Sequence, residues 1–157
     1  MADIEWVRYK SDLPEVTEAD LDGLEADRGV KLPERYRALV KAHRGDIPRP
    51  AIADIGERKT PVNALFFVKK DFQGNGSSYN IWHYIEELDA ELPQELGAKL
   101  IPFTSNSGHA IFVFDYRHGP EPEVALVDTE QDLEEQGEDA ITKIADSFDE
   151  FLDGLHD

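Results

Sequence analysis

The stretch of sequence that decides the fold covers residues 100–116 and reads Leu-Ile-Pro-Phe-Thr-Ser-Asn-Ser-Gly-His-Ala-Ile-Phe-Val-Phe-Asp-Tyr. Its second half, residues 110–116, is apolar at nearly every position and rich in residues that favour strands. A strand that is apolar on both faces needs cover on both sides, which predicts a central position in a sheet. Residues 100–103 form a shorter apolar run, and the polar link 104–109 contains a glycine suited to a turn. We therefore expect a β-hairpin in the middle of the core.

Three helices are predicted before this hairpin. Thr17 is placed to cap the first helix, and Gly29 is placed to end it. Pro33 is expected as the first residue of the second helix, because its fixed φ suits that position. The third helix is expected to begin at Ser78 or its neighbour, since apolar residues then follow at intervals of four and three, namely Ile81, Ile85 and Leu88.

The remaining segments alternate between strands and loops. Residues 62–69 are predicted to form a strand, and residues 123–128 a strand that pairs with the hairpin. Three prolines in residues 47–61 indicate mostly loop, and residues 129–139 are expected to form a highly acidic loop. A last helix begun by Ser147 is traced by Ile144, Phe148, Phe151, Leu152 and Leu155.

Helices at both ends with consecutive strands between them predict an α+β fold, with a central antiparallel sheet and helices packed against it. A length of 157 residues suits one domain with its own core. We expect that domain to span residues 1–157, with residues 1–16 as an N-terminal arm that docks through Trp6 and Tyr9.

The charge is the strongest compositional feature. Sixteen Lys and Arg against 34 Asp and Glu give a net charge of −18. This argues against binding to nucleic acid or to an anionic membrane surface, and it suits a basic partner. Residues 121–157 hold 14 acidic residues and one basic residue, Lys143, so this segment alone has a net charge of −13. The other interpretation of the acidity is general solubility, or adaptation to a salty cytoplasm.

Targeting signals are not recognisable in the sequence. No run reaches the roughly 18 to 20 apolar residues that span a membrane, and the first residues lack the basic and apolar parts of a secretory signal. The absence of cysteine excludes a disulfide framework and a Cys-bound metal. We expect a cytoplasmic location.

No motif predicts catalysis or metal binding. The serines before His109 lack the Gly-x-Ser-x-Gly elbow, and residues 74–78 lack the lysine of a phosphate-binding loop. Residues 128–139 begin like a calcium loop, but their sixth and twelfth positions are Leu133 and Asp139, which favours a solvated acidic loop over a weak cation site. The sequence therefore predicts no enzyme, no cofactor and no metal. Structural roles are also expected for the five histidines, which show no paired spacing: His43, His83, His109, His118 and His156.

Three motifs in order carry a resemblance to a known family. Leu32-Pro33-Glu34-Arg35-Tyr36 resembles a Leu-Pro-x-x-Tyr helix opening. Residues 100–103, followed by Gly108 and the strand to Asp115, resemble a central Ile-Pro-Phe hairpin. Residues 145–152 resemble a closing Ala-x-Ser-Phe-x-x-Phe-Leu helix. Together, over residues 17–155, they resemble the SUKH superfamily, the cell-wall-assembly-regulator or SMI/KNR-like type.

Because bacterial members of this superfamily are often immunity proteins, the resemblance implies a non-enzymatic protein that neutralises a cognate toxin. An acidic face would then occlude a basic nuclease domain. The alternative is a housekeeping regulatory or scaffold module that binds a host protein, while a hydrolase using Asp115 or Asp128 is least favoured because no matching base or metal set accompanies either. For Trp82, burial in the core is the alternative to a binding role. The candidate partner-binding residues are Glu121, Glu123, Asp128, Glu130, Asp132, Glu134, Glu135, Asn106, His109, Tyr79 and Trp82.

Overall fold

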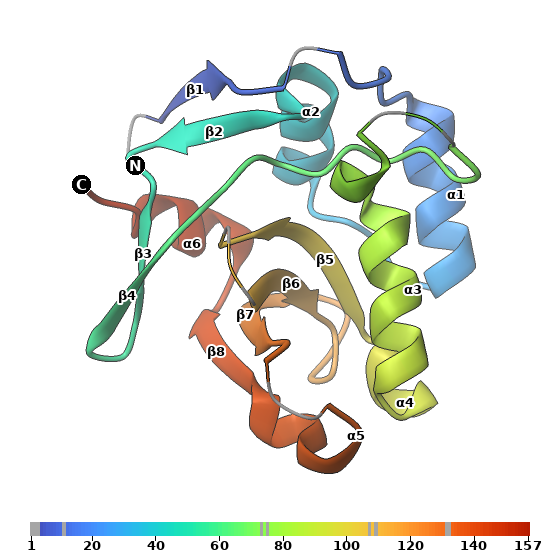
Figure 1. The fold of residues 1–157 in the computed structure, drawn as a ribbon, viewed down its shortest axis with the longest axis vertical. Coiled ribbons are helices and arrows are strands. Elements are labelled where there is room, and N and C mark those ends of the chain that lie inside the picture. Colours follow the sequence, from blue (N-terminus) through green and yellow to red (C-terminus); the bar gives the residue numbers. More distant parts are fainter. Residues whose placement is uncertain are drawn as a thin grey trace.

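A four-stranded antiparallel sheet forms the centre of the fold in the computed structural model (Figure 1). The model describes residues 4–157 apart from Ser11, Gln73, Asn75, Ser107, His109, Gln131 and Asp132, together with all their side chains except those of Glu134 and Gln136. This sheet confirms the predicted hairpin, its central position and the α+β class. In spatial order its strands are β5 (Leu100–Ser105), β6 (Ala110–Asp115), β7 (Glu123–Asp128) and β8 (Ile141–Ala145).

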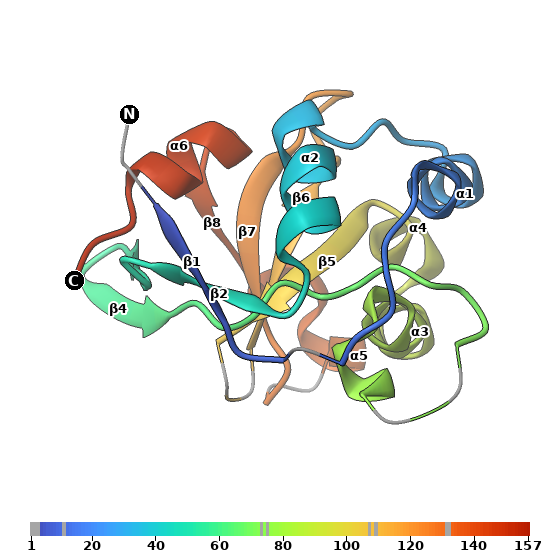
Figure 2. The same ribbon diagram turned by 90° about the horizontal axis from the view of Figure 1, so that it is seen from above.

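Aromatic side chains cover one face of this sheet. Every residue of β6 is buried, as a strand that is apolar on both faces requires. Phe103 of β5 stacks on Phe114 of β6 with ring centroids 4.4 Å apart. Tyr36 of α2 (Glu34–His43) packs edge-on against Phe114, and Phe148 of α6 (Phe148–Asp153) packs against Phe103. Two helices are thereby fixed to the sheet, and Figure 2 shows α2 lying across β5 and β6.

Capping side chains set the limits of the helices. α1 (Glu18–Arg28) begins with the predicted Thr17 cap, whose hydroxyl accepts from the Asp20 N–H at 3.2 Å, and it ends at Gly29, with φ of 67°. α3 (Ile81–Glu91) begins later than predicted, because Asn80 is its cap and the short helix η1 (Ser77–Tyr79) precedes it. Pro33 lies one residue outside α2 instead of being its first residue. α4 (Gln94–Gly97) follows α3, and no helix in the described part of the chain has the length and apolarity to cross a membrane.

The proline-rich segment 47–61 is mostly strand, so its assignment to a loop was wrong. It contains most of β2 (Asp46–Arg49), all of β3 (Ile52–Ile55) and all of β4 (Arg58–Pro61). These strands form two-stranded sheets, β1 (Glu5–Arg8) with β2 and β3 with β4, in which edge positions tolerate the missing N–H of proline. The N-terminal segment accordingly holds a strand, and it docks through Trp6, whose ring stacks on His43 with centroids 5.4 Å apart. Tyr9 stays 56% exposed.

Residues 62–69 are extended but do not form the predicted strand. The N–H groups of Asn63 and Phe66 donate to carbonyls of β5 at 2.9 and 3.0 Å, whereas the N–H of Leu65 donates to Asp46 of β2 at 3.1 Å. The chain therefore alternates between two sheets and belongs to neither. Its apolar side chains are buried between them, which explains the strand-like composition.

The C-terminal third differs from its prediction at two places. The predicted acidic loop 129–139 contains α5 (Leu133–Gln136) and leads into η2 (Gly137–Ala140), because buried Leu133 and Ala140 hold the segment against the core. Ile144 lies in β8 rather than in the last helix. Its spacing from Phe148 suits a helix, but its neighbours Lys143 and Ala145 pair with β7, and Ile144 itself lies at a bulge in that pairing. Ser147 caps α6 as predicted, its hydroxyl accepting from the Glu150 N–H at 3.1 Å.

Replacing Phe112 by Ala is expected to lower the free energy of unfolding by about 3 to 5 kcal/mol, because the fully buried ring leaves a cavity among the aromatic side chains. Urea denaturation followed by circular dichroism measures the change. Tyr9→Ala removes an exposed aromatic ring and is expected to change the same quantity by less than about 1 kcal/mol. An unchanged midpoint for Phe112→Ala would refute the central position of β6.

The C-terminus is joined to β3 by a histidine. His156 exchanges two backbone hydrogen bonds of 3.0 Å with Ile52, and its Nε2 lies 2.8 Å from the Asp54 carboxylate. The hydrogen bond with Asp54 raises the pKa of His156, and the same bond, followed by the one from Lys59, lowers the pKa of Asp54. The stabilisation from His156 is fully present below its ordinary pKa and is lost as pH rises through the raised pKa. That from Asp54 is lost as pH falls through its lowered pKa.

We therefore expect Asp54→Asn to lower the pKa of His156, measured by NMR titration of the imidazole ring. Between about pH 6 and 8 the wild type should lose more thermal stability than this variant, because the charged pair contributes only while His156 is protonated. Glu57→Gln removes an exposed carboxylate from the same hairpin and serves as control. Equal titration of His156 in wild type and Asp54→Asn would contradict the pairing.

Candidate functional site

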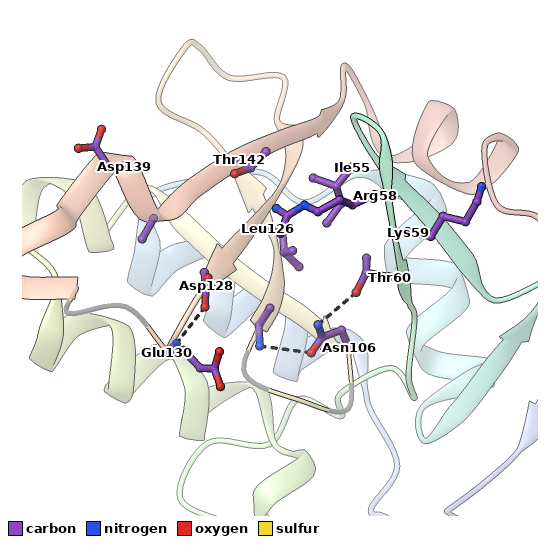
Figure 3. A pocket seen from close by; sticks show the side chains of 12 residues that line it. Ile55, Arg58, Lys59, Thr60, Asn106, Leu126, Asp128, Glu130, Asp139 and Thr142 are labelled. Atoms are coloured by element: carbon purple, nitrogen blue, oxygen red, sulfur yellow. Dashed lines mark hydrogen bonds between the residues drawn. The ribbon is translucent and has the colours of Figure 1, made fainter.

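An open pocket of about 290 Å³ lies where the β3–β4 hairpin faces the ends of β6, β7 and β8 (Figure 3). The hairpin supplies Ile55, Arg58 and Thr60 to one wall, and the sheet supplies a largely buried apolar floor of Ala110 and Leu126. The remaining lining is mostly polar and comes from segments far apart in the sequence. It consists of Lys59, Asn106, Asp128, Glu130, Asp139, Ala140 and Thr142.

Asn106 organises this pocket through both ends of its side-chain amide. Its Oδ1 accepts from the N–H groups of Gly108 and Ala110 at 2.9 and 3.2 Å, which holds the β5–β6 turn. Its Nδ2 donates to Thr60 Oγ1 at 3.1 Å, which ties the β3–β4 hairpin to that turn. One predicted site residue therefore connects two walls of the pocket.

Carboxylates dominate the charge around the pocket. Asp128 ends β7, and its Oδ1 accepts from the Glu130 N–H at 3.0 Å, so the two carboxylates lie close together. Asp139 comes from η2. Figure 3 shows Arg58 pointing across the pocket toward Leu126, whereas Lys59 points away. Such a surface is rich in hydrogen-bond acceptors and suits an ammonium or guanidinium donor.

Glu121 and Glu123 lie at the opposite end of β7 from this pocket. Glu123 is opposite Asp115 in the β6–β7 pairing, and its carboxylate contacts Lys143 at 2.9 Å and His118 at 2.8 Å. The hydrogen bond from Lys143, followed by the one from His118, lowers the pKa of Glu123. At about 3.3 Å per residue, the steps from Glu123 to Asp128 separate the two ends of this strand by about 17 Å. The structure therefore divides the predicted acidic region into two areas.

The other predicted residues lie elsewhere on the molecule. Glu135 is exposed on α5, whereas His109, Asp132 and the side chain of Glu134 lie outside the described residues. Trp82 is only 9% exposed and packs in the core, with Lys70 Nζ 4.9 Å from its ring, so its burial supports the core role. Tyr79 is half-buried in η1 beside Tyr9 and Lys10. Neither Trp82 nor Tyr79 lines the pocket.

Acidic residues on α1 are used for packing between helices. Arg37 of α2 contacts Glu18, Asp22 and Glu25 at 2.5, 2.9 and 2.8 Å, and Lys41 also contacts Glu18. The hydrogen bond from Lys41, followed by that from Arg37, lowers the pKa of Glu18. Basic residues of α2 are thus paired with carboxylates of α1 within the molecule. The C-terminal segment has no comparable basic neighbour in sequence, since one lysine accompanies 14 acidic residues.

Arg58, Thr60 and Thr142 belong to the pocket but were not predicted from the sequence. The first two fall in the segment taken for a loop, and Thr142 lies in β8, the strand that was missed. One signal was available, because Gly56 and Glu57 form a two-residue connection between two short runs. Glycine at the first position of such a connection indicates a tight hairpin.

A comparison with protein-family models matches residues 15–154 to the SMI1 / KNR4 family (SUKH-1). The chain belongs to this family. The match covers α1 through α6 and therefore every segment that lines the pocket, whereas β1 precedes it. No curated protein matches this SUKH-1 chain in a sequence comparison. Family membership confirms the resemblance seen in the three motifs, and it leaves the partner to be identified.

A double-mutant cycle tests whether Asn106 connects the two walls. Thr60→Val, Asn106→Ala and the double variant are expected to give a coupling free energy of about 0.5 to 1.5 kcal/mol, because one hydrogen bond joins the two side chains. Chemical denaturation provides the unfolding free energies of the wild type and of the three variants. A control cycle with Thr142→Val, which removes a hydroxyl on the other wall, should show coupling near zero. Equal coupling in both cycles would refute a specific Asn106–Thr60 contact.

Proposed function

We propose that this SUKH-1 protein is a non-enzymatic, immunity-type binding protein that neutralises a cognate bacterial toxin. The class of toxin that fits its charge is a basic nuclease domain, because such a domain has a cationic groove for nucleic acid. Membership of the SMI1 / KNR4 family supports a binding role. The observation that carries the proposal is the gathering of Asp128, Glu130 and Asp139 around one pocket.

Neutralisation would work by occlusion. Carboxylates around the pocket attract the cationic groove and speed the encounter, and a bound SUKH-1 protein then blocks access of nucleic acid. The polar lining offers carboxylate, hydroxyl and amide groups to lysine and arginine side chains of the toxin.

Neutralising two carboxylates of the pocket lining and one exposed carboxylate on α5 is expected to slow association with the toxin. The variant combines Glu130→Gln, Glu135→Gln and Asp139→Asn, and the probe is a catalytically inactive toxin domain encoded beside the gene. At 50 mM salt the association rate should fall about three- to tenfold, and the difference should shrink as salt rises, because the Debye length falls from about 10 Å at 0.1 M to about 3 Å at 1 M. Dissociation should change less. Surface plasmon resonance at several salt concentrations measures both rates.

The control variant carries Glu5→Gln, Asp12→Asn and Glu15→Gln. It removes the same total charge from exposed positions on β1 and the segment before α1, at the end of the molecule opposite α5 (Figure 1). Equal slowing in both variants would mean that only net charge matters and that the pocket is not the contact. Absence of binding by wild type would favour the regulatory or scaffold role instead.

A further inference from the structure

The β6–β7 hairpin brings together three residues that the sequence did not group. Asp115 and Glu123 are opposite each other in the strand pairing, and His118 lies in the turn between them. One ligand atom from each residue lies within 4.8 Å of the others. The two strands thus set the separation of the carboxylates, and the turn places the imidazole beside them.

Each of the three side chains is held in place by a neighbour. Asp115 is only 1% exposed, and its two carboxylate oxygens accept hydrogen bonds from Arg117 at 2.8 to 3.0 Å. His118 Nδ1 lies 2.8 Å from Glu123 Oε1, and the His118 side chain is 65% exposed. Donor atoms that are oriented by further contacts are typical of metal sites in proteins.

The charge of the surroundings favours a divalent cation. Four carboxylates and two cations contact one another around the β6–β7 turn, which leaves a net charge of −2 before any contribution from His118. The net charge of the whole chain, which includes these groups, is −18. These groups are Asp115, Glu123, Glu138, Asp146, Arg117 and Lys143.

We propose that Asp115, His118 and Glu123 form a binding site for a divalent transition-metal ion such as Zn²⁺. One imidazole and two carboxylates suit zinc, whereas magnesium and calcium prefer oxygen ligands alone. Three protein ligands leave a fourth tetrahedral position for water. An ion can reach His118 directly from solvent, because this side chain is exposed.

Lys143 is the cation that the metal ion has to displace. Its ammonium group lies 2.9 Å from Glu123 Oε2, and it also contacts Asp146. Because the side chain is 51% exposed, it can keep the contact with Asp146 when a metal ion takes Glu123. Arg117 remains on Asp115, where it orients the carboxylate. Removal of the Lys143 charge should therefore strengthen metal binding.

Isothermal titration calorimetry of the full chain with Zn²⁺, after treatment with a chelator, tests the site. Wild type should bind one equivalent, and His118→Ala and Glu123→Gln should each weaken binding at least tenfold. Lys143→Gln should bind more tightly than wild type. Zn²⁺ should raise the melting temperature of wild type but not of His118→Ala, which gives a second readout.

His156→Ala is the matched control, because His156 also contacts a carboxylate, that of Asp54. It should bind Zn²⁺ as wild type does. No binding by wild type at millimolar Zn²⁺, or equal binding by wild type and His118→Ala, would overturn the proposal. Equal weakening by His156→Ala and His118→Ala would also overturn it, because it would show non-specific binding to histidines. Circular dichroism checks that each variant is folded.

Discussion

Ring packing between Phe103 and Phe114 is the contact on which the rest of the structure depends. Both rings contact Tyr36 of α2 and Phe148 of α6, so one aromatic cluster attaches two helices to the central strands. The position of α6 then fixes His156, which pairs with Ile52 of the β3–β4 hairpin. That hairpin is one wall of the pocket. The aromatic core is therefore linked to the candidate binding surface through α6, His156 and the β3–β4 hairpin.

The acidity of the chain serves different roles in different places. On α1 it stabilises helix packing, because Arg37 joins three carboxylates there. Around the pocket, Asp128 and Asp139 come from different elements and meet at a surface. Net charge alone does not distinguish the two uses. The position of the basic residues does, since α2 carries cations that face α1 while residues 121–157 contain one lysine.

The fold was predictable wherever local pattern and burial agree. The strands β5 and β6 show a strand pattern in the sequence and lie in the core, and Thr17 and Ser147 cap helices in the structure as in the sequence. Segments 47–61 and 62–69 were misassigned because prolines argue against strands, and because an extended chain between two sheets has a strand's composition without its pairing. Ile144 fits a helical spacing, but it lies at a bulge of β8, and the pairing of β8 with β7 is long-range and leaves no local signal.

The candidate site, like the fold, was predictable only in part. Asn106, Asp128 and Glu130 stand out in the sequence as polar or acidic residues next to predicted strands. Thr60 does not, because its contact with Asn106 joins residues 46 positions apart. The acidic segment also reads as continuous, whereas β7 holds Glu123 and Asp128 at opposite ends of a rigid strand. The two proposed sites therefore do not overlap, and a partner seated on the pocket does not have to cover the β6–β7 turn.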